Sequence, residues 1–201
     1  MRLLLVVVLY IFCHVASAQS SYANGTLRFS GKIERDLKVG KWQHFYPNGK
    51  SSAVLNYEAG MLSGVQKYYS EEGKLIAHEY WEDDLQIDSS WYYYPNGKLE
   101  KKGSFVDGLY DGHWVFYFES GQLKREGFYK VGLPTDHWTF YYENGNVNQA
   151  GAFSEGKETD LWKYYDEIGQ QTYEGEWREG REVGQWYYFK KGKKKKWKNF
   201  D

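Results

Sequence analysis

The chain has almost no cysteine, little proline and no excess of charge of either sign. Its one cysteine, Cys13, lies in an N-terminal segment that we expect to be removed, so the mature chain would have no disulfide and no cysteine metal ligand. The three prolines form no linker, and we expect a single domain. With 26 basic and 27 acidic residues, the overall charge identifies no partner.

Catalytic and cofactor-binding signatures are also absent. The sequence contains no nucleophile elbow, phosphate-binding loop, dinucleotide fingerprint or metalloprotease helix motif. Only His113 and His137 share a repeat position, and one repeat would place their Cα atoms about 10 Å apart, too far to share one zinc ion. The acidic run from Glu82 to Asp84 lacks the glycine-kinked loop of an EF-hand. We therefore expect no enzyme activity, no cofactor and no metal.

What the chain has in abundance is a repeat. Glycines recur every 24 residues, and the last follows one residue short, at Gly49, Gly73, Gly97, Gly121, Gly145, Gly169 and Gly192. A fixed period of this size is typical of a small supersecondary unit that buries its apolar face by stacking on copies of itself. The turn Asn24-Gly25 lies one period before Gly49 and indicates a truncated leading unit.

Each unit has the pattern of a β-hairpin. Aromatic residues recur at every second position, as in Trp114-Val-Phe116, and such side chains share one face of a strand. Asn48-Gly49, Asn96-Gly97 and Asn144-Gly145 place Asn-Gly where a tight hairpin needs positive φ at two successive residues. We predict about seven hairpins side by side, whose fourteen strands at ~4.8 Å would extend on the order of 65 Å with a progressive twist.

Two columns of large apolar residues run through the repeats. The first contains Ile33, Tyr57, Trp81, Phe105, Tyr129, Phe153 and Trp177, and the second contains Trp42, Trp114, Trp138, Trp162 and Trp186. Strand glycines at Gly103, Gly127, Gly151 and Gly175 are predicted to let a neighbouring ring lie flat over the backbone. In the second and third units Leu55 and Glu79 replace this glycine, and Gln66 and Ser90 replace the tryptophan. We expect a distorted or specialised stack there.

A strip of tyrosines is the candidate binding surface. Aromatic residues make up 20% of the chain, more than one sheet can bury deeply. We interpret Tyr117, Tyr141, Tyr165 and Tyr188 as alternating away from the tryptophan column, with accessible hydroxyls. Such a strip suits a peptide, a glycan or a partner strand. The alternative is cross-strand stacking that only stabilises the sheet.

The N-terminal segment has the pattern of a secretory signal peptide. Arg2 precedes the apolar run from Leu3 to Val15, and the next residues, through Ala18, are small. We predict cleavage between Ala18 and Gln19, so that residues 1–18 are the signal peptide and 19–201 the repeat domain, located outside the cell or in the periplasm. A membrane anchor would need about 20 apolar residues. Bulky Phe12 disfavours lipid attachment at Cys13.

The C-terminal end is rich in lysine. Seven of the last twelve residues are lysines, among them Lys193, Lys194, Lys195 and Lys196, which precede Trp197. A basic end of this kind suits contact with anionic lipid, lipopolysaccharide or nucleic acid. The alternative is a solvated final strand, because lysine commonly guards an exposed sheet edge against aggregation.

The stretch from Tyr173 to Trp186, YEGEWREGREVGQW, resembles the MORN repeat (membrane occupation and recognition nexus). The other units, with a longer tryptophan-led strand and an Asn-Gly turn, resemble the bacterial variant of that repeat, which occurs in secreted proteins and in proteins labelled antitoxin-like. The resemblance covers about Tyr22 to the C-terminus. It implies an all-β fold, an elongated single twisted sheet, and a scaffold or binding module rather than a catalyst.

Three functions are compatible with these observations. The first is a secreted or periplasmic, non-enzymatic scaffold for protein–protein interaction, whose partner is another protein. The second is a cell-envelope module that binds a glycan, or an anionic membrane surface through the C-terminal lysines. The third, antitoxin-like or immunity activity, rests only on the label of similar proteins. We expect no nucleic-acid partner.

Overall fold

The computed structural model describes residues 15–201, and this part of the chain is all-β, with no helix. The strands are β1 (Val15–Ser21), β2 (Leu27–Glu34), β3 (Leu37–Phe45), β4 (Ser51–Glu58), β5 (Met61–Leu62), β6 (Gly64–Tyr69), β7 (Leu75–Glu82), β8 (Leu85–Tyr93), β9 (Leu99–Val106), β10 (Leu109–Tyr117), β11 (Leu123–Lys130), β12 (Leu133–Tyr141), β13 (Val147–Ser154), β14 (Lys157–Tyr165), β15 (Gln171–Arg178), β16 (Arg181–Lys190) and β17 (Lys193–Phe200). Within these residues no helix is long and apolar enough to span a membrane.

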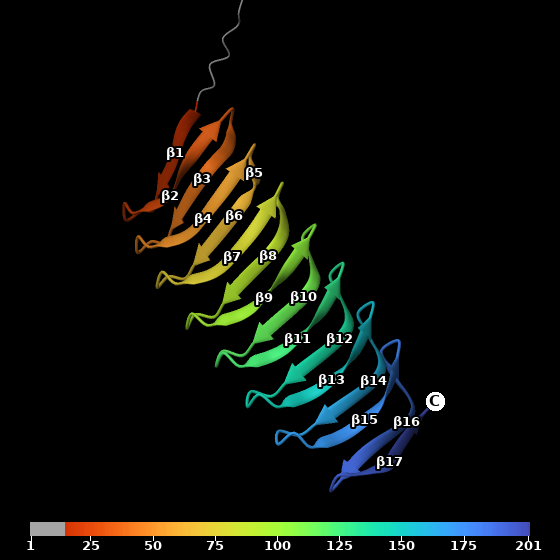
Figure 1. Ribbon diagram of the computed structural model, residues 1–201. Coiled ribbons are helices and arrows are strands. Elements are labelled where there is room, and N and C mark those ends of the chain that lie inside the picture. The colour runs from red at the N-terminus through yellow and green to blue at the C-terminus, as the bar shows by residue number, and fades with distance from the viewer. Residues whose placement is uncertain (1–14) are drawn as a thin grey trace, which may run out of the picture.

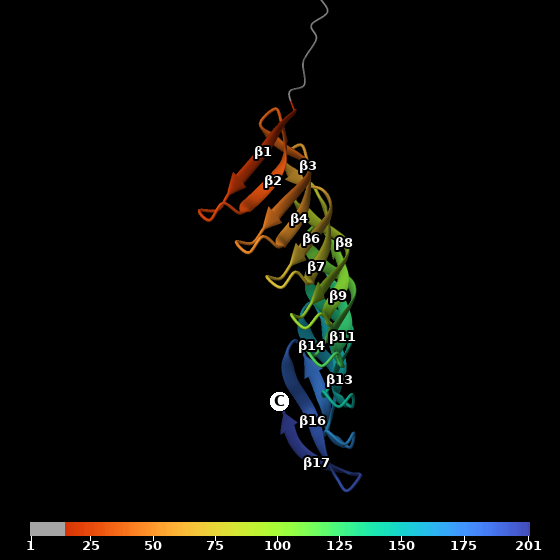
Figure 2. The same cartoon turned by 90° about the vertical axis from the view of Figure 1, so that its left-hand side faces the viewer.

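The strands form one open antiparallel meander in chain order. Each strand pairs with its sequence neighbours, and the short β5 and β6 both pair with β4 and together replace one strand. Figure 1 shows the resulting ladder of strands, which begins at β1 and ends at β17. The view in Figure 2 shows that the ladder is twisted and curved. The predicted elongated, twisted sheet of seven hairpins is therefore confirmed, with β1 and β17 added at its ends.

The turns differ from the prediction. Inside each hairpin a two-residue turn has positive φ at both central residues, as at Asp107 (49°) and Gly108 (76°). The Asn-Gly segments instead connect one hairpin to the next. Gly49 has a φ of 83° but Asn48 does not adopt positive φ, and its side-chain oxygen accepts a hydrogen bond from Lys50 N at 3.0 Å. The prediction of a two-residue Asn-Gly hairpin turn was wrong, because that local bond favours a longer turn with a bulge.

A bulge in the second strand of every hairpin orients the tryptophan position. The residue two places before that position has positive φ in all seven hairpins, at Gly40, Gly64, Asp88, Gly112, Asp136, Asp160 and Gly184. The register shifts there, as between Asp111 and Val115 of β10. In the second hairpin the same bulge separates β5 from β6. Bulges increase local twist and redirect side chains, which explains the repeated inward orientation of one residue per hairpin.

Candidate interaction face

The five column tryptophans define one face of the sheet, which we call the tryptophan face. Trp42, Trp114, Trp138, Trp162 and Trp186 are all buried. Each indole ring covers a glycine eleven residues earlier: a Cβ added to Gly103 would lie 2.2 Å from the ring of Trp114. The indole N–H of Trp114 donates to the backbone oxygen of Ser104 at 3.0 Å. The prediction that strand glycines admit a flat ring is confirmed.

Ring-to-ring contacts continue from the fourth hairpin to the seventh. The successive centroid distances are 5.2 Å for Phe105–Trp114, 6.3 Å for Trp114–Tyr129, 5.1 Å for Tyr129–Trp138, 6.0 Å for Trp138–Phe153, 5.2 Å for Phe153–Trp162, 6.3 Å for Trp162–Tyr164 and 5.9 Å for Tyr164–Trp186. Most of these pairs meet edge to face, the arrangement that the ring quadrupoles favour. Because residues 15–201 form a single sheet with no second layer, this ladder, with its tryptophans buried, is the core of the sheet.

In the second hairpin a glutamine replaces the tryptophan. Gln66 is completely buried. Its side-chain oxygen accepts a hydrogen bond from Asn56 N at 2.7 Å, and its amide nitrogen donates to Asn56 O at 3.1 Å. A buried amide with these partners satisfies backbone groups of β4 opposite the bulge at Gly64. Leu55, in place of glycine, occupies space that an indole would need.

In the third hairpin a polar pair occupies the glycine and tryptophan positions. Ser90 is completely buried and accepts a hydrogen bond from Gln86 Nε2 at 2.9 Å. Glu79 is only 8% exposed and accepts a hydrogen bond from Trp81 Nε1 at 2.9 Å. In both irregular hairpins a larger residue at the glycine position is thus matched by a smaller one at the tryptophan position. The two changes compensate in space, so the sheet continues through these hairpins.

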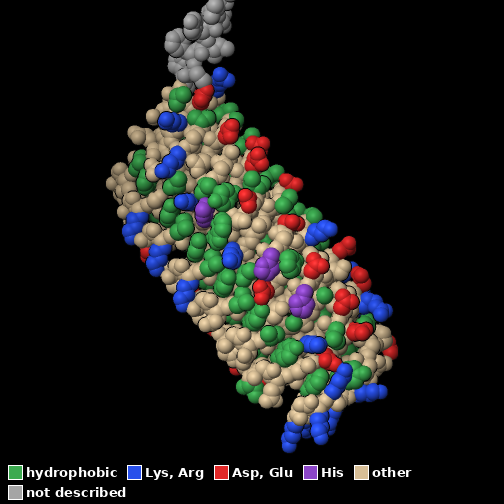
Figure 3. Space-filling view, viewed as in Figure 1, with side chains coloured by type: hydrophobic (Ala, Val, Ile, Leu, Met, Phe, Trp, Pro, Cys, Tyr) green, Lys and Arg blue, Asp and Glu red, His purple; other side chains and the backbone are tan. Residues whose placement is uncertain are grey.

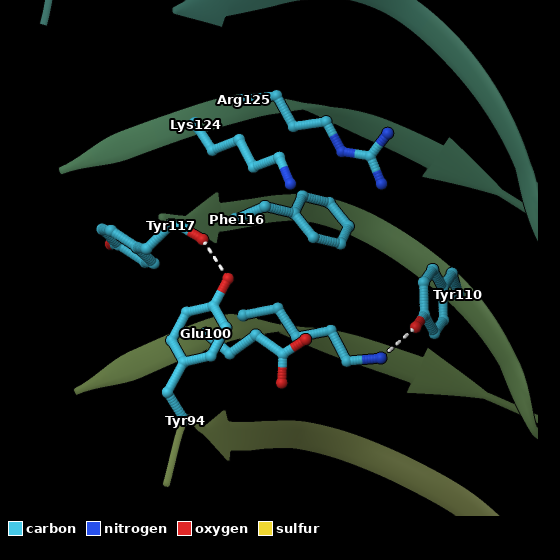
Figure 4. A pocket seen from close by; sticks show the side chains of 8 residues that line it. Tyr94, Glu100, Tyr110, Phe116, Tyr117, Lys124 and Arg125 are labelled. Carbon is cyan, nitrogen blue, oxygen red and sulfur yellow. Dashed lines mark hydrogen bonds between the residues drawn. The ribbon is translucent and has the colours of Figure 1, made fainter. Parts of the chain in front are cut away.

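A hollow lies on the tryptophan face at the fourth and fifth hairpins, with a volume of about 280 Å³. It is lined by Tyr94, Glu100, Lys101, Tyr110, Phe116, Tyr117, Lys124 and Arg125. Figure 4 shows Lys124 and Arg125 above the ring of Phe116, with Glu100 on the other side. The hydroxyl of Tyr94 closes one end by donating to the carbonyl of Tyr117 at 2.8 Å.

The cations of this hollow rest on aromatic rings. The Cζ atom of Arg125 lies 4.3 Å from the ring centre of Phe116, and Nζ of Lys101 lies 4.4 Å from that of Tyr92. Lys101 also donates a hydrogen bond to the Tyr110 hydroxyl at 2.8 Å. Such cation–π contacts orient the charged groups without neutralising them. Sequence reasoning missed this hollow because its cations occur in only two repeats and follow no motif.

The predicted tyrosine strip is divided between the two faces. Tyr117, Tyr141 and Tyr165 share one repeat position, at the ends of β10, β12 and β14. The prediction for Tyr188 was wrong, because it lies two residues after Trp186 in β16 and pairs with Tyr173. It therefore belongs to the tryptophan face. In this hairpin the residue equivalent to Tyr165 is Phe189.

Tyr141 shows that the strip is not a row of free hydroxyls. Its hydroxyl donates to Glu126 Oε1 at 2.8 Å, and Glu126 Oε2 lies 3.4 Å from His113 Nε2. Burial together with the Glu126 hydrogen bond raises the pKa of Tyr141 to about 12. This face, opposite to the tryptophans, carries a polar network. Among residues 15–201 no group of three or more histidine, aspartate, glutamate or cysteine side chains is arranged to hold a metal ion.

The lysine-rich end is the last strand of the sheet. Lys193, Lys194, Lys195 and Lys196 are exposed along β17, and Lys194 pairs with Glu174. Trp197 is 51% exposed and packs on Tyr173 with ring centres 5.1 Å apart. In Figure 3, basic side chains crowd this lower end, whereas acidic side chains follow the right-hand edge. The lysines thus line the terminal edge of the ladder.

The predicted processing site lies at the other end. Residues 1–14 of the predicted signal peptide fall outside the described residues. Ala18 and Gln19 lie in β1, opposite Gly31 and Ser30 of β2. Cleavage between them would remove the first four residues of this edge strand.

The comparisons with known proteins agree with the repeat. A family model described as "MORN repeat variant" matches residues 38–59, 62–83, 92–107, 110–130 and 137–153. No curated protein matches the chain. The solved structures "Crystal Structure of TcdB2-TccC3" and "Crystal Structure of TcdB2-TccC3-Cdc42" are each 10% identical to it, with TM-scores of 0.20 and 0.21. In both cases the similarity covers 87% of this chain and 13% of the other chain.

Proposed function

Because the chain belongs to the MORN repeat variant family, we propose that it is a non-enzymatic scaffold whose tryptophan face binds another protein. The observation that carries the proposal is the ring ladder from Phe105 to Trp186, with a hollow at the end of the ladder where the fourth and fifth hairpins meet. The column tryptophans are buried, so the rings open to a partner are the half-buried ones beside them, Tyr92, Tyr110, Tyr129, Phe140 and Phe153. Many modest contacts along a repeat surface give affinity without a deep pocket.

We place this scaffold in the periplasm or outside the cell. The support is the charged, apolar and small-residue pattern that ends at Ala18. A mature chain without cysteine depends on no disulfide, so its stability there would come from stacked hairpins.

A second candidate function is attachment to an anionic envelope surface. It is favoured by the exposed lysines of β17 beside Trp197, because an aromatic ring among cations suits a membrane or glycan interface. The antitoxin-like alternative has no comparable support in the residues of this face, and export would separate the protein from a cytosolic toxin.

Affinity capture from the envelope of the producing cells tests both functions. The bait is the full-length protein, compared with Lys193→Gln/Lys195→Gln/Lys196→Gln, which removes charge from β17 and keeps Lys194 paired with Glu174. A protein partner retained by both baits supports the scaffold. Capture that disappears with the lysine variant supports electrostatic envelope attachment instead. Recovery of no partner by either bait would contradict both.

A further inference from the structure

We infer that the hollow over Phe116 is a recognition site for a carboxylate, presented by an acidic segment of the partner. This inference rests on the proposed scaffold function and names the chemistry of its partner. The hollow contains three cations, Lys101, Lys124 and Arg125, and one carboxylate, Glu100, so its formal charge is +2. An anionic group is the complementary ligand.

The cations of the hollow have no carboxylate partner within the described chain. The ion pairs there are His113–Glu126, Lys157–Glu179 and Lys194–Glu174, and none involves a residue of the hollow. The Nε atom of Arg125 is buried and has no hydrogen-bond partner. Buried polar groups are nearly always hydrogen-bonded in native proteins. The described chain therefore leaves the guanidinium of Arg125 incompletely paired.

Aromatic rings hold the donors toward the open side. Arg125 stacks on Phe116, and Lys124 Nζ lies 5.4 Å from the ring centre of Phe118. The planar guanidinium of Arg125 can donate two parallel N–H groups to the two oxygens of a carboxylate. Lys101 comes from β9 and Arg125 from β11, two strands away, so their backbones lie about 10 Å apart.

The cationic site is local to two hairpins. The residues equivalent to Lys101 and Arg125 in neighbouring hairpins are Ala53, Ala77 and Gln149, which carry no charge. The flanking surface is instead aromatic, with Tyr92 on one side and Phe140 on the other. A ligand that uses both parts is a chain with an acidic side chain at the hollow and apolar side chains beside it. This favours an acidic peptide segment over a small free anion.

A titration with model peptides tests the assignment. The probe is a twelve-residue peptide with glutamate and phenylalanine alternating between neutral polar residues, and its control replaces each glutamate by glutamine. We expect the full-length protein to bind the acidic peptide at least tenfold more tightly by calorimetry, because hydrogen bonds to charged groups are stronger than those between neutral groups. Equal affinity for both peptides would overturn the assignment.

Matched variants locate the contact. Lys101→Gln and Arg125→Gln should each weaken binding about tenfold, whereas Lys102→Gln, the next residue of β9 on the opposite face, should change it less than about twofold. Arg125→Lys keeps the charge but loses the planar guanidinium with its two parallel N–H donors, and should give an intermediate affinity. Tryptophan indole N–H signals in NMR spectra show whether each variant keeps the fold. Folded Lys101→Gln and Arg125→Gln proteins that bind like the parent would contradict the site.

Two further arms separate related outcomes. A phosphoserine peptide that binds much more tightly than the glutamate peptide would overturn the choice of carboxylate in favour of phosphate. If a captured partner binds the tryptophan face of Arg125→Gln as tightly as that of the parent, the proposed scaffold function is retained. That result would refute only the recognition of a carboxylate at the hollow.

Discussion

At the scale of single residues, each regular hairpin depends on a matched glycine and tryptophan. The indole ring of Trp114 occupies the space where a side chain at Gly103 would stand. Gly103→Ala should therefore lower the free energy of unfolding by about 1–3 kcal/mol, the usual cost of overpacking. Chemical denaturation measures the change. Ser104→Ala, at the next residue, adds no atom and should cost much less; equal losses would show that the glycine is not required for packing.

Two histidines make stability depend on pH. Burial, with Lys38 and Arg28 nearby, lowers the pKa of His44, and burial, with Lys67 nearby, lowers that of His78. Below about pH 6.5 the unfolded chain therefore binds protons that the folded chain does not, and the stability present at neutral pH declines as pH falls through this window.

Denaturation midpoints at about pH 7.5 and 5.5 test this dependence. The double variant His44→Gln/His78→Gln should show a smaller decrease between the two conditions than the parent. The exposed His137→Gln serves as the control and should show the parent's decrease. A double variant that loses as much stability as the parent on acidification would exclude these two residues as its source.

At the scale of elements, neighbouring hairpins are joined by their connecting turns. Tyr94 donates its hydroxyl to Tyr117 O at 2.8 Å, and Asn96 donates its amide to Glu119 O at 2.9 Å. The same pair of bonds recurs two periods before and two periods after, as Tyr46 to Tyr69 O and Tyr142 to Tyr165 O show. These bonds tie a turn to the next one at Tyr46, Tyr94 and Tyr142, whereas Ser70 and Phe118 occupy the tyrosine position in the turns between them.

Tyr94→Phe tests the contribution of one such bond. Removing one hydrogen bond should cost about 0.5–1.5 kcal/mol, and the Tyr117 carbonyl would lose its partner. Amide hydrogen exchange should accelerate in residues 117–122 more than elsewhere. Tyr93→Phe removes a neighbouring phenol as the comparison. Acceleration spread evenly over the sheet would argue against a local role for the bond.

The irregular third hairpin provides a test of coupled positions. Ser90→Trp alone should destabilise the protein, because Glu79 occupies the space of the glycine on which an indole packs. Adding Glu79→Gly should recover much of the loss, with a coupling energy of about 0.5–3 kcal/mol in a double-mutant cycle. Additive losses would mean that the two positions do not share one space.

The sequence predicted the elements of this fold better than their connections. The period, the hairpins and the glycine–tryptophan packing follow from residue spacing alone. The turn at Asn48-Gly49 was not predicted correctly from spacing, because the Asn48 side chain accepts a hydrogen bond from Lys50 N and makes a longer turn. Tyr188 was misplaced because it is the equivalent of Tyr164, two residues after the tryptophan, whereas Phe189 is the equivalent of Tyr165. The hollow at Arg125 was not predictable, since it needs side chains from β9, β10 and β11 in one place.

At the scale of the whole molecule, seven hairpins produce two unlike faces and two unlike ends. The tryptophan face is a ring ladder interrupted in the second and third hairpins by Gln66 and Ser90, and its centre carries the cationic hollow. The opposite face holds the Tyr141–Glu126–His113 network. A partner that extends along the sheet would contact several hairpins at once, so its affinity would come from the array rather than from any one repeat.

Hydroxyl-radical footprinting of the free protein and of its complex with the captured partner tests which face binds. The scaffold account predicts that oxidation falls at Tyr92, Tyr110 and Phe140, which pack along the tryptophan face. It predicts no change at Phe128 or Trp91, which lie on the opposite face. Protection confined to that opposite face, or to Trp197 at the lysine-rich end, would contradict the account.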